Sequence, residues 1–170
     1  EQLHDYIGKL KGKHHKIWYM ADGIYSMYGD HAPIMVLKNL MQLYPQLCVY
    51  FDDVHGMSWM GQRGAGFVKT HWPVLPENMV LVTTLSKTFG ASGACILCGN
   101  RDLYTKIKNF GGPLTFSAQL EPASVAAAIA SANIHLSNEI INLQQRLLGK
   151  INLFKKLLLS YELPLISHSN

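Results

Sequence analysis

Apolar residues are concentrated in four short runs, at residues 16–21, 47–52, 78–85 and 94–98. Runs of this length, bounded by glycine and polar residues, are typical of buried β-strands. A helical segment separates the first two runs, which predicts a parallel crossover. Only a short loop separates the last two, so we predict that they pair antiparallel.

The segments between and after these runs have helical spacing. At 33–44 an apolar face is formed by Leu37, Leu40, Met41 and Tyr44, with Pro33 in the first turn. We also predict helices at 1–13, 101–109, 122–136 and 137–161, and loops at 22–30, 69–76 and 110–119. The long apolar stripe of the last helix indicates packing against a core or another domain. The pattern predicts an α/β fold, a three-layer, mostly parallel sheet flanked by helices.

Length and charge narrow the function classes. A chain of 170 residues with 48% hydrophobic and 15% charged residues can bury one core. No apolar run is long enough to span a bilayer, and the N-terminus does not read as a signal peptide. The net charge of +4 comes without a basic cluster interleaved with aromatics. We therefore expect no nucleic-acid partner, whereas anionic small molecules suit the charge.

The cysteines do not indicate a redox or zinc site. Cys95 and Cys98 form a C-x-x-C pattern, but it lies in a predicted strand, where residues three apart face opposite sides. A single pair cannot complete a structural zinc site. We expect buried, unpaired thiols and a reducing, cytoplasmic setting.

A lysine marks the first candidate for chemistry. Lys87 lies in the stretch Thr83–Gly93, just past the third apolar run, among hydroxyl residues and between that run and the glycines Gly90 and Gly93. The carboxyl ends of strands are where open α/β sheets bind ligands. An ordinary solvated lysine is one interpretation. The other is an amine held in a partly desolvated pocket that forms a Schiff base with an aldehyde.

The preceding predicted strand supplies partners for that amine. It ends in Asp52-Asp53-Val54-His55-Gly56. If the aldehyde is pyridoxal phosphate, Asp52 is placed to keep the ring nitrogen protonated. His55 could hydrogen-bond the phenolic oxygen of the cofactor or the carboxylate of a substrate. A metal site is disfavoured, because Asp52, Asp53 and His55 cannot all converge from one strand end.

Three ordered segments resemble the α-oxoamine synthase family of fold-type-I pyridoxal phosphate enzymes. They are residues 22–33 (DGIYSMYGDHAP), 52–56 (DDVHG) and 84–90 (TLSKTFG). The resemblance extends from about residue 16 to about residue 130. It implies a pyridoxal phosphate-dependent acyltransferase that condenses an amino acid with an acyl-CoA and acts as a homodimer.

The resemblance also implies site residues. Lys87 and His55 correspond to catalytic positions, and both also contact the cofactor. The other implied cofactor-binding residues are Ser26, Asp52, Thr84 and Ser117. Ser117 matches a hydroxyl that reaches the cofactor phosphate of the partner subunit, although a helix N-cap serine is an alternative interpretation.

The chain departs from the family pattern in two ways. Many members read His-Gly-Thr-Gly or His-Ala-Thr-Gly where this chain has His55-Gly56-Met57-Ser58-Trp59, which leaves the acyl chain open. Family members are also about twice this length or more. We therefore expect residues 1–136 to be the second half of a cofactor-binding large domain. Residues 137–170 would be a helix leading to a small C-terminal domain, and the fragment alone would be inactive.

Two other functions stay open from the sequence. One is a pyridoxal phosphate-dependent aminotransferase or lyase of the same fold. The other is a non-catalytic domain that kept these segments and serves only in assembly. The sequence names neither the amino acid nor the acyl chain.

Overall fold

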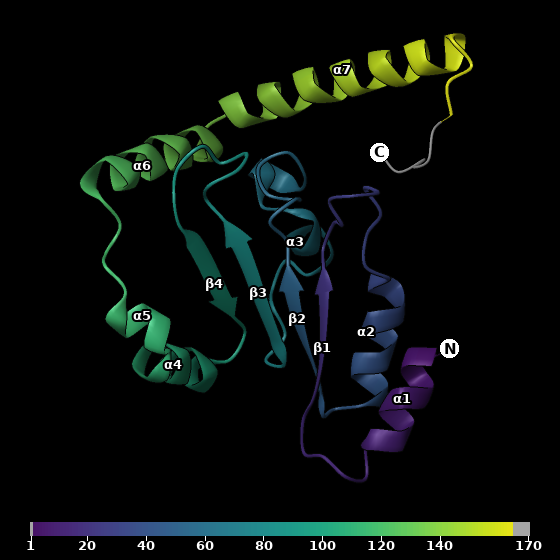
Figure 1. Ribbon diagram of the computed structural model, residues 1–170, viewed down its shortest axis with the longest axis vertical. Helices are drawn as coiled ribbons and strands as arrows, with labels where there is room; N and C mark the ends of the chain where they lie inside the picture. The colour runs from purple at the N-terminus through teal and green to yellow at the C-terminus, as the bar shows by residue number, and fades with distance from the viewer. Residues whose placement is uncertain (1, 165–170) are drawn as a thin grey trace.

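The computed structural model describes residues 2–164 and contains one four-stranded sheet (Figure 1). Its strands lie side by side in chain order: β1 (Ile17–Asp22), β2 (Leu47–Asp52), β3 (Met79–Thr84) and β4 (Ala94–Cys98). The pairs β1–β2 and β2–β3 are parallel, and β3–β4 is antiparallel. The mostly parallel sheet and its antiparallel last strand confirm the prediction.

Helices surround the sheet, and two short ones were not predicted. The helices are α1 (Gln2–Leu10), α2 (Ile34–Leu43), α3 (Phe67–His71), α4 (Arg101–Phe110), α5 (Gly112–Phe116), α6 (Pro122–Leu136) and α7 (Glu139–Ser160), with a 3-10 turn η1 at Gln62–Gly64. The predicted loop at 69–76 is wrong where α3 occupies it. The predicted loop at 110–119 is wrong for the end of α4 and for α5.

One face of the sheet forms the core with α1, α2 and α3. Val49 and Phe51 of β2 are fully buried there, against Leu37 of α2 and Val68 of α3. Because alternate residues of a strand face opposite sides, Tyr50 and Asp52 belong to the other face. That face is more open, since Met20 of β1 is 68% exposed.

The helices α6 and α7 pass over the carboxyl end of the parallel strands (Figure 1). They are separate helices, because the backbone is extended at Ser137. The apolar stripe of α7 is buried only at its start, at Ile140, whereas Phe154 is 61% exposed. Within the described residues, the core covers only the start of this stripe, and packing of the rest against another domain stays a prediction. No helix in this part of the chain is long and apolar enough to cross a membrane.

The three thiols are free, as predicted, but not all are buried. Cys48 is buried in β2, whereas Cys95 is exposed and Cys98 half-buried in β4. The prediction of buried thiols is wrong for Cys95, because the first three residues of the edge strand β4 are exposed on both faces of the sheet.

Candidate functional site

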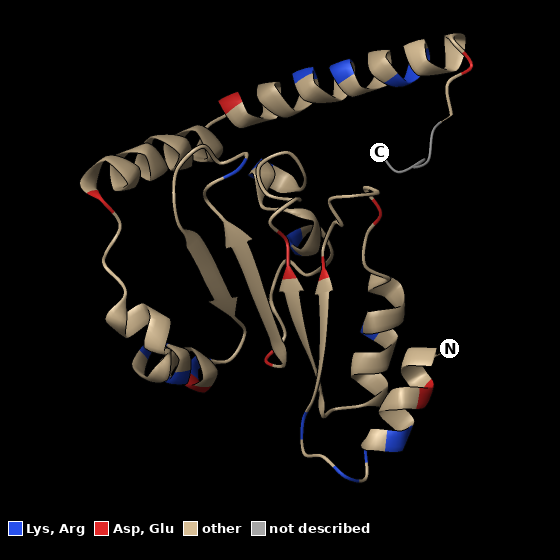
Figure 2. Ribbon diagram, viewed as in Figure 1, with Lys and Arg blue, Asp and Glu red and all other residues tan. Residues whose placement is uncertain are grey.

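Two loops at the carboxyl end of the sheet bring two predicted site residues together. We call residues 53–66, after β2, the His55 loop, and residues 85–93, after β3, the Lys87 loop. Lys87 Nζ lies 2.9 Å from His55 Nε2. Figure 2 shows a basic residue in the loop after β3, with acidic residues at the tips of β1 and β2. The two side chains can make this contact because β2 and β3 are parallel, which places both loops at the carboxyl edge of the sheet.

The contact between the two side chains defines their roles as donor and acceptor. An ammonium group has no acceptor, so Lys87 donates and His55 Nε2 accepts. The neutral imidazole then carries its proton on Nδ1. The indole N–H of Trp59 donates to the carbonyl of His55 and fixes the backbone of that histidine. The pair can therefore hold or move a proton between an amine and an imidazole.

Asp52 is the last residue of β2 and lies on the sheet face opposite the core. Its Oδ1 accepts the N–H of Val54 at 3.0 Å. In the register, Asp22 and Val82 are its neighbours on β1 and β3. Thr84 follows Val82 by two residues and so shares this face. A carboxylate and a hydroxyl thus face the same side of the sheet, below the two loops.

Hydroxyl groups shape the start of the Lys87 loop. Thr84 Oγ1 lies 2.8 Å from Ser86 Oγ and donates to the carbonyl of Gly93 at 3.2 Å. The N–H of Ala91 donates to the carbonyl of Leu85 at 2.7 Å, which closes the loop. The loop is therefore a defined turn, and the position of Lys87 in it is set by these bonds.

The other two predicted site residues lie apart from this contact. Ser26 is exposed in the loop after β1. Ser117 is exposed at the end of α5, beside α4, which follows the opposite end of β4 (Figure 1). Its hydroxyl donates to the carbonyl of Pro113. The N-cap interpretation of Ser117 is not observed, because Glu121 is the N-cap residue of α6.

The enclosure predicted around Lys87 is not provided by the described residues. Lys87, Ser86 and Thr88 are exposed, so this part of the chain does not itself enclose the amine, and the partly desolvated pocket stays a prediction. The contacts from α6 fall on Phe89, which is buried, and leave residues 86–88 exposed. As for metals, no group of three or more His, Cys, Asp or Glu residues suited to a metal ion occurs among residues 2–164.

Sequence reasoning missed the role of Asp53. This residue is 2% exposed, and its Oδ2 accepts the N–H of Val68 at 2.8 Å. Its Oδ1 is buried without a hydrogen-bond partner. Burial, opposed by hydrogen bonds from the backbone of Val68 and Phe67, raises its pKa to about 7. The signal was the strand alternation, since Asp53 continues the buried face of Val49 and Phe51.

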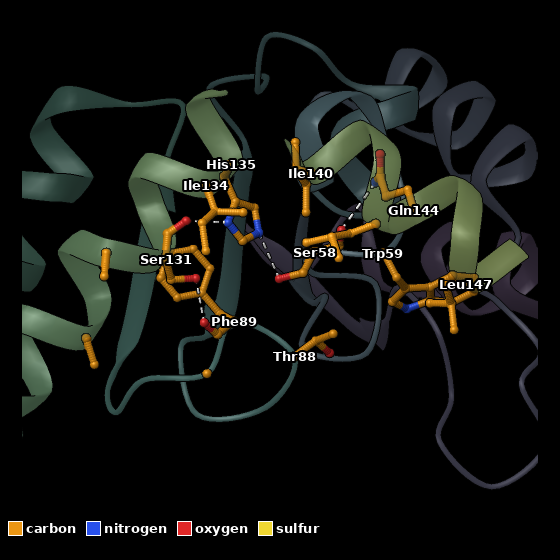
Figure 3. Close-up of a pocket in the computed structure, with 14 residues that line it drawn as sticks. Ser58, Trp59, Thr88, Phe89, Ser131, Ile134, His135, Ile140, Gln144 and Leu147 are labelled. Atoms are coloured by element: carbon orange, nitrogen blue, oxygen red, sulfur yellow. Dashed lines mark hydrogen bonds between the residues drawn. The ribbon is translucent and has the colours of Figure 1, made fainter. Parts of the chain in front are cut away.

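A cavity of about 460 Å³ adjoins the Lys87 loop and was also missed (Figure 3). It is lined by Thr88, Phe89 and Gly90 of that loop, by Ser58 and Trp59 of the His55 loop, and by residues of α6 and α7. Ser58 Oγ lies 3.0 Å from Nε2 of His135, a residue of α6. The two residues are 77 positions apart, and no local pattern in the sequence connects them.

Comparison with known proteins gives the family. The model of the family "Aminotransferase class I and II" matches residues 1–169. The 8-amino-7-oxononanoate synthase of Xylella fastidiosa (strain 9a5c) is 35% identical over 119 residues, 70% of this chain and 29% of the relative. The chain therefore spans less than a third of the length of this curated relative.

Solved structures agree with the fold. A structure of SPT with PLP superposes on 98% of this chain and 41% of its own, with a TM-score of 0.81 at 22% identity. Sphingomonas wittichii serine palmitoyltransferase covers 79% of this chain and 33% of its own, with a TM-score of 0.69 at 27% identity. Together with the family match over nearly its whole length, these findings show that the chain belongs to the aminotransferase class I and II family, in agreement with its resemblance to the α-oxoamine synthases.

Proposed function

We propose that this chain is the catalytic part of a pyridoxal phosphate-dependent acyltransferase that condenses an amino acid with an acyl-CoA. The observation that carries the proposal is the 2.9 Å contact between Lys87 Nζ and His55 Nε2. It occurs where Asp52 ends the adjacent strand. The similarity to 8-amino-7-oxononanoate synthase and to serine palmitoyltransferase supports an acyltransferase.

The donor set fits pyridoxal phosphate. The cofactor needs an amine for its aldehyde, a carboxylate for its ring nitrogen and hydroxyl or N–H groups for its phosphate. Lys87, Asp52 and Thr84 supply these three kinds of group at one edge of the sheet. When bound, the cofactor acts as an electron sink that stabilises negative charge on the α-carbon of an amino acid.

Each residue has a proposed role. Lys87 holds the cofactor through its amine and, once released, removes the α-proton of the amino acid as a general base. Asp52 keeps a proton on the pyridine nitrogen. His55 donates to the phenolic oxygen or binds the substrate carboxylate, and Thr84 and Ser26 line the cofactor pocket. The deprotonated α-carbon would be the nucleophile that forms a C–C bond to the thioester carbonyl, and the C–S bond would break to release coenzyme A as the thiol.

The arrangement of the whole enzyme is also part of the proposal. Residues 1–136 form the second half of a cofactor-binding large domain, and residues 137–170 begin the connection to a small domain. Residues 165–170 of this range lie outside the described residues. The enzyme is a homodimer in which Ser117 serves the phosphate site of the partner subunit, which agrees with the distance of α5 from the Lys87 loop in Figure 1. Its free thiols suit the cytoplasm.

The first prediction concerns Lys87 in the full-length protein that contains this chain. The variant Lys87→Ala should lose the visible absorbance of lysine-bound pyridoxal phosphate. Its turnover should fall by about 10²–10⁴-fold, the usual contribution of a general base. The control is Lys13→Ala, which removes an exposed lysine of the turn after α1 and should change neither quantity. An unchanged absorbance band in Lys87→Ala would show that another residue holds the cofactor.

Coenzyme A release separates the proposed function from its rivals. An acyltransferase frees a thiol from acyl-CoA only when the amino acid is present. An aminotransferase or lyase of the same fold would bind the cofactor and convert amino acids without releasing this thiol. A domain that serves only in assembly would show the absorbance of free pyridoxal phosphate and no band of the lysine-bound cofactor when pyridoxal phosphate is titrated into it.

A further inference from the structure

The helices α6 and α7 hold both loops of the candidate site by side-chain hydrogen bonds. From α6, Ser131 Oγ donates to the carbonyl of Phe89 in the Lys87 loop. From α7, Gln144 Nε2 donates to the carbonyls of Ser58 and Gly61 in the His55 loop, at 3.2 and 3.1 Å. One helix pair therefore contacts the two loops that carry Lys87 and His55.

His135 is the side chain that contacts both loops at once (Figure 3). Its Nδ1 lies 2.8 Å from the carbonyl of Ser131, which can only accept, so Nδ1 carries the proton. Nε2 then accepts the hydroxyl proton of Ser58 at 3.0 Å in the His55 loop. The imidazole also stacks on Phe89, two residues past Lys87, with ring centroids 4.7 Å apart.

The backbone of Ser58 indicates that its hydroxyl is needed. This residue is 4% exposed and has a φ of +74°. The left-handed region strains a residue with a side chain, and glycine would avoid that strain. The bond to His135 offsets the strain and gives the serine a function that glycine could not have.

A serine hydroxyl bonded to a histidine is also the arrangement of a nucleophile and its base. Here the hydroxyl is buried and the imidazole is covered by the ring of Phe89. The second ring nitrogen faces a backbone carbonyl instead of a carboxylate. The geometry therefore favours a fixed link between the loops over a hydrolytic pair.

We propose that His135 is a positioning residue, which fixes the His55 loop to the Lys87 loop through Ser58 and Phe89. The link keeps His55 Nε2 and Lys87 Nζ within hydrogen-bonding distance of each other. This inference rests on the proposed function of those two residues. It adds a residue outside the sheet edge, on the helix that leads toward residues 137–170, to the machinery of the site.

The test uses the full-length protein and three variants. His135→Phe keeps a ring against Phe89 but removes both hydrogen bonds. Ser58→Ala removes only the hydroxyl, and the double variant combines them. Asn133→Ala, at an exposed position of the same helix, is the matched control. His135→Gln, whose amide oxygen can accept from Ser58, is the rescue variant.

The first readout is amide hydrogen exchange without cofactor. In His135→Phe, residues 56–62 and 87–91 should exchange about tenfold faster, while β1, β2 and β3 exchange as in the wild type. Ser58→Ala should accelerate only residues 56–62, and Asn133→Ala neither segment. This readout does not depend on Lys87 binding a cofactor, so it separates this inference from the proposed function.

The second readout is turnover per bound cofactor. His135→Phe should lower kcat by about tenfold or more with little change in KM, because small misplacements of reacting groups are costly. The double variant should be no slower than His135→Phe, and His135→Gln should recover most of the loss. Unaccelerated exchange in either loop of His135→Phe would overturn the proposal. The proposal would also be overturned if the loss of kcat in His135→Phe were fully explained by weaker cofactor binding or by a lower melting temperature.

Discussion

Two neighbouring carboxylates, Asp52 and Asp53, have different environments because successive strand residues face opposite sides. Asp52 faces the side of Thr84 and stays half-buried. Asp53 faces the core, where it caps the start of α3 through the N–H of Val68. A methyl group on Gly23, Gly56 or Gly66 would collide with its carboxylate oxygens. Asp53 therefore joins three backbone segments around the site, whereas Asp52 is available for a ligand.

The pKa of Asp53 leads to a prediction about stability. It rises from 3.8 in the unfolded chain to about 7 in the folded one. Between these values the folded state binds more protons, so the free energy of unfolding should fall as the pH rises, by up to ~4 kcal/mol. Asp53→Asn cannot ionise and should flatten the profile. Urea unfolding of both full-length proteins between pH 4 and 8 measures this, and parallel profiles would refute it.

The residues of the site differ in how far the sequence predicts them. Lys87 and His55 could be found because each follows an apolar strand, and parallel order brings such ends together. The burial of Asp53 could have been predicted from strand alternation. The link between Ser58 and His135 could not have been predicted, because it depends on how α6 lies over the His55 loop. The exposure of Lys87 could not be predicted, because the enclosure of a loop depends on long-range packing that a local sequence pattern does not specify.

Among the helices and strands, the longer elements could be predicted from the sequence and the shortest could not. The four strands and α6 stand within a residue or two of their predicted positions, because their apolar patterns are continuous. The helices α3 and α5 have five residues each, too few for a 3.6-residue period to show. The apolar patterns of α6 and α7 continue up to the break at Ser137 and give no sign of it. The predicted start of α7 is therefore two residues too early.

The η1 turn of the His55 loop carries the next prediction. Gly64 has a φ of +71°, and a Cβ there would lie 2.6 Å from the carbonyl oxygen of Ser58. We expect Gly64→Ala to destabilise the full-length protein by about 2–4 kcal/mol, from left-handed strain and a backbone collision.

Gly149 is the matched glycine, because nothing lies within 4 Å of a Cβ added there in the middle of α7. Gly149→Ala should stabilise by up to about 1 kcal/mol through helix propensity. Thermal unfolding of the two variants should therefore shift in opposite directions. Equal shifts would mean that the η1 turn tolerates a side chain.

At the scale of the whole molecule, this chain leaves much apolar surface uncovered. Phe110 and Phe116, at the ends of α4 and α5, are 83% and 90% exposed. Met20 and Ile96 are exposed on the sheet face opposite the core. Single exposed apolar residues are ordinary, but many large apolar residues left exposed on one chain are typical of association surfaces. We therefore expect residues 1–170 alone to self-associate, which sedimentation would detect.

The exposed aromatics beside Ser117 link assembly to cofactor binding. If α5 belongs to the subunit interface, Phe116→Asp should dissociate the full-length dimer, because a carboxylate buried in an apolar contact is costly. The cofactor should bind more weakly in the same variant, because each site would lose the partner's hydroxyl. Ser117→Ala should weaken binding of the cofactor without dissociating the dimer.

The control is Val74→Asp, at an 84% exposed position after α3, which should neither weaken cofactor binding nor dissociate the dimer. Sedimentation with pyridoxal phosphate titration distinguishes these cases, and a monomeric Phe116→Asp that binds the cofactor normally would place the phosphate site within one subunit.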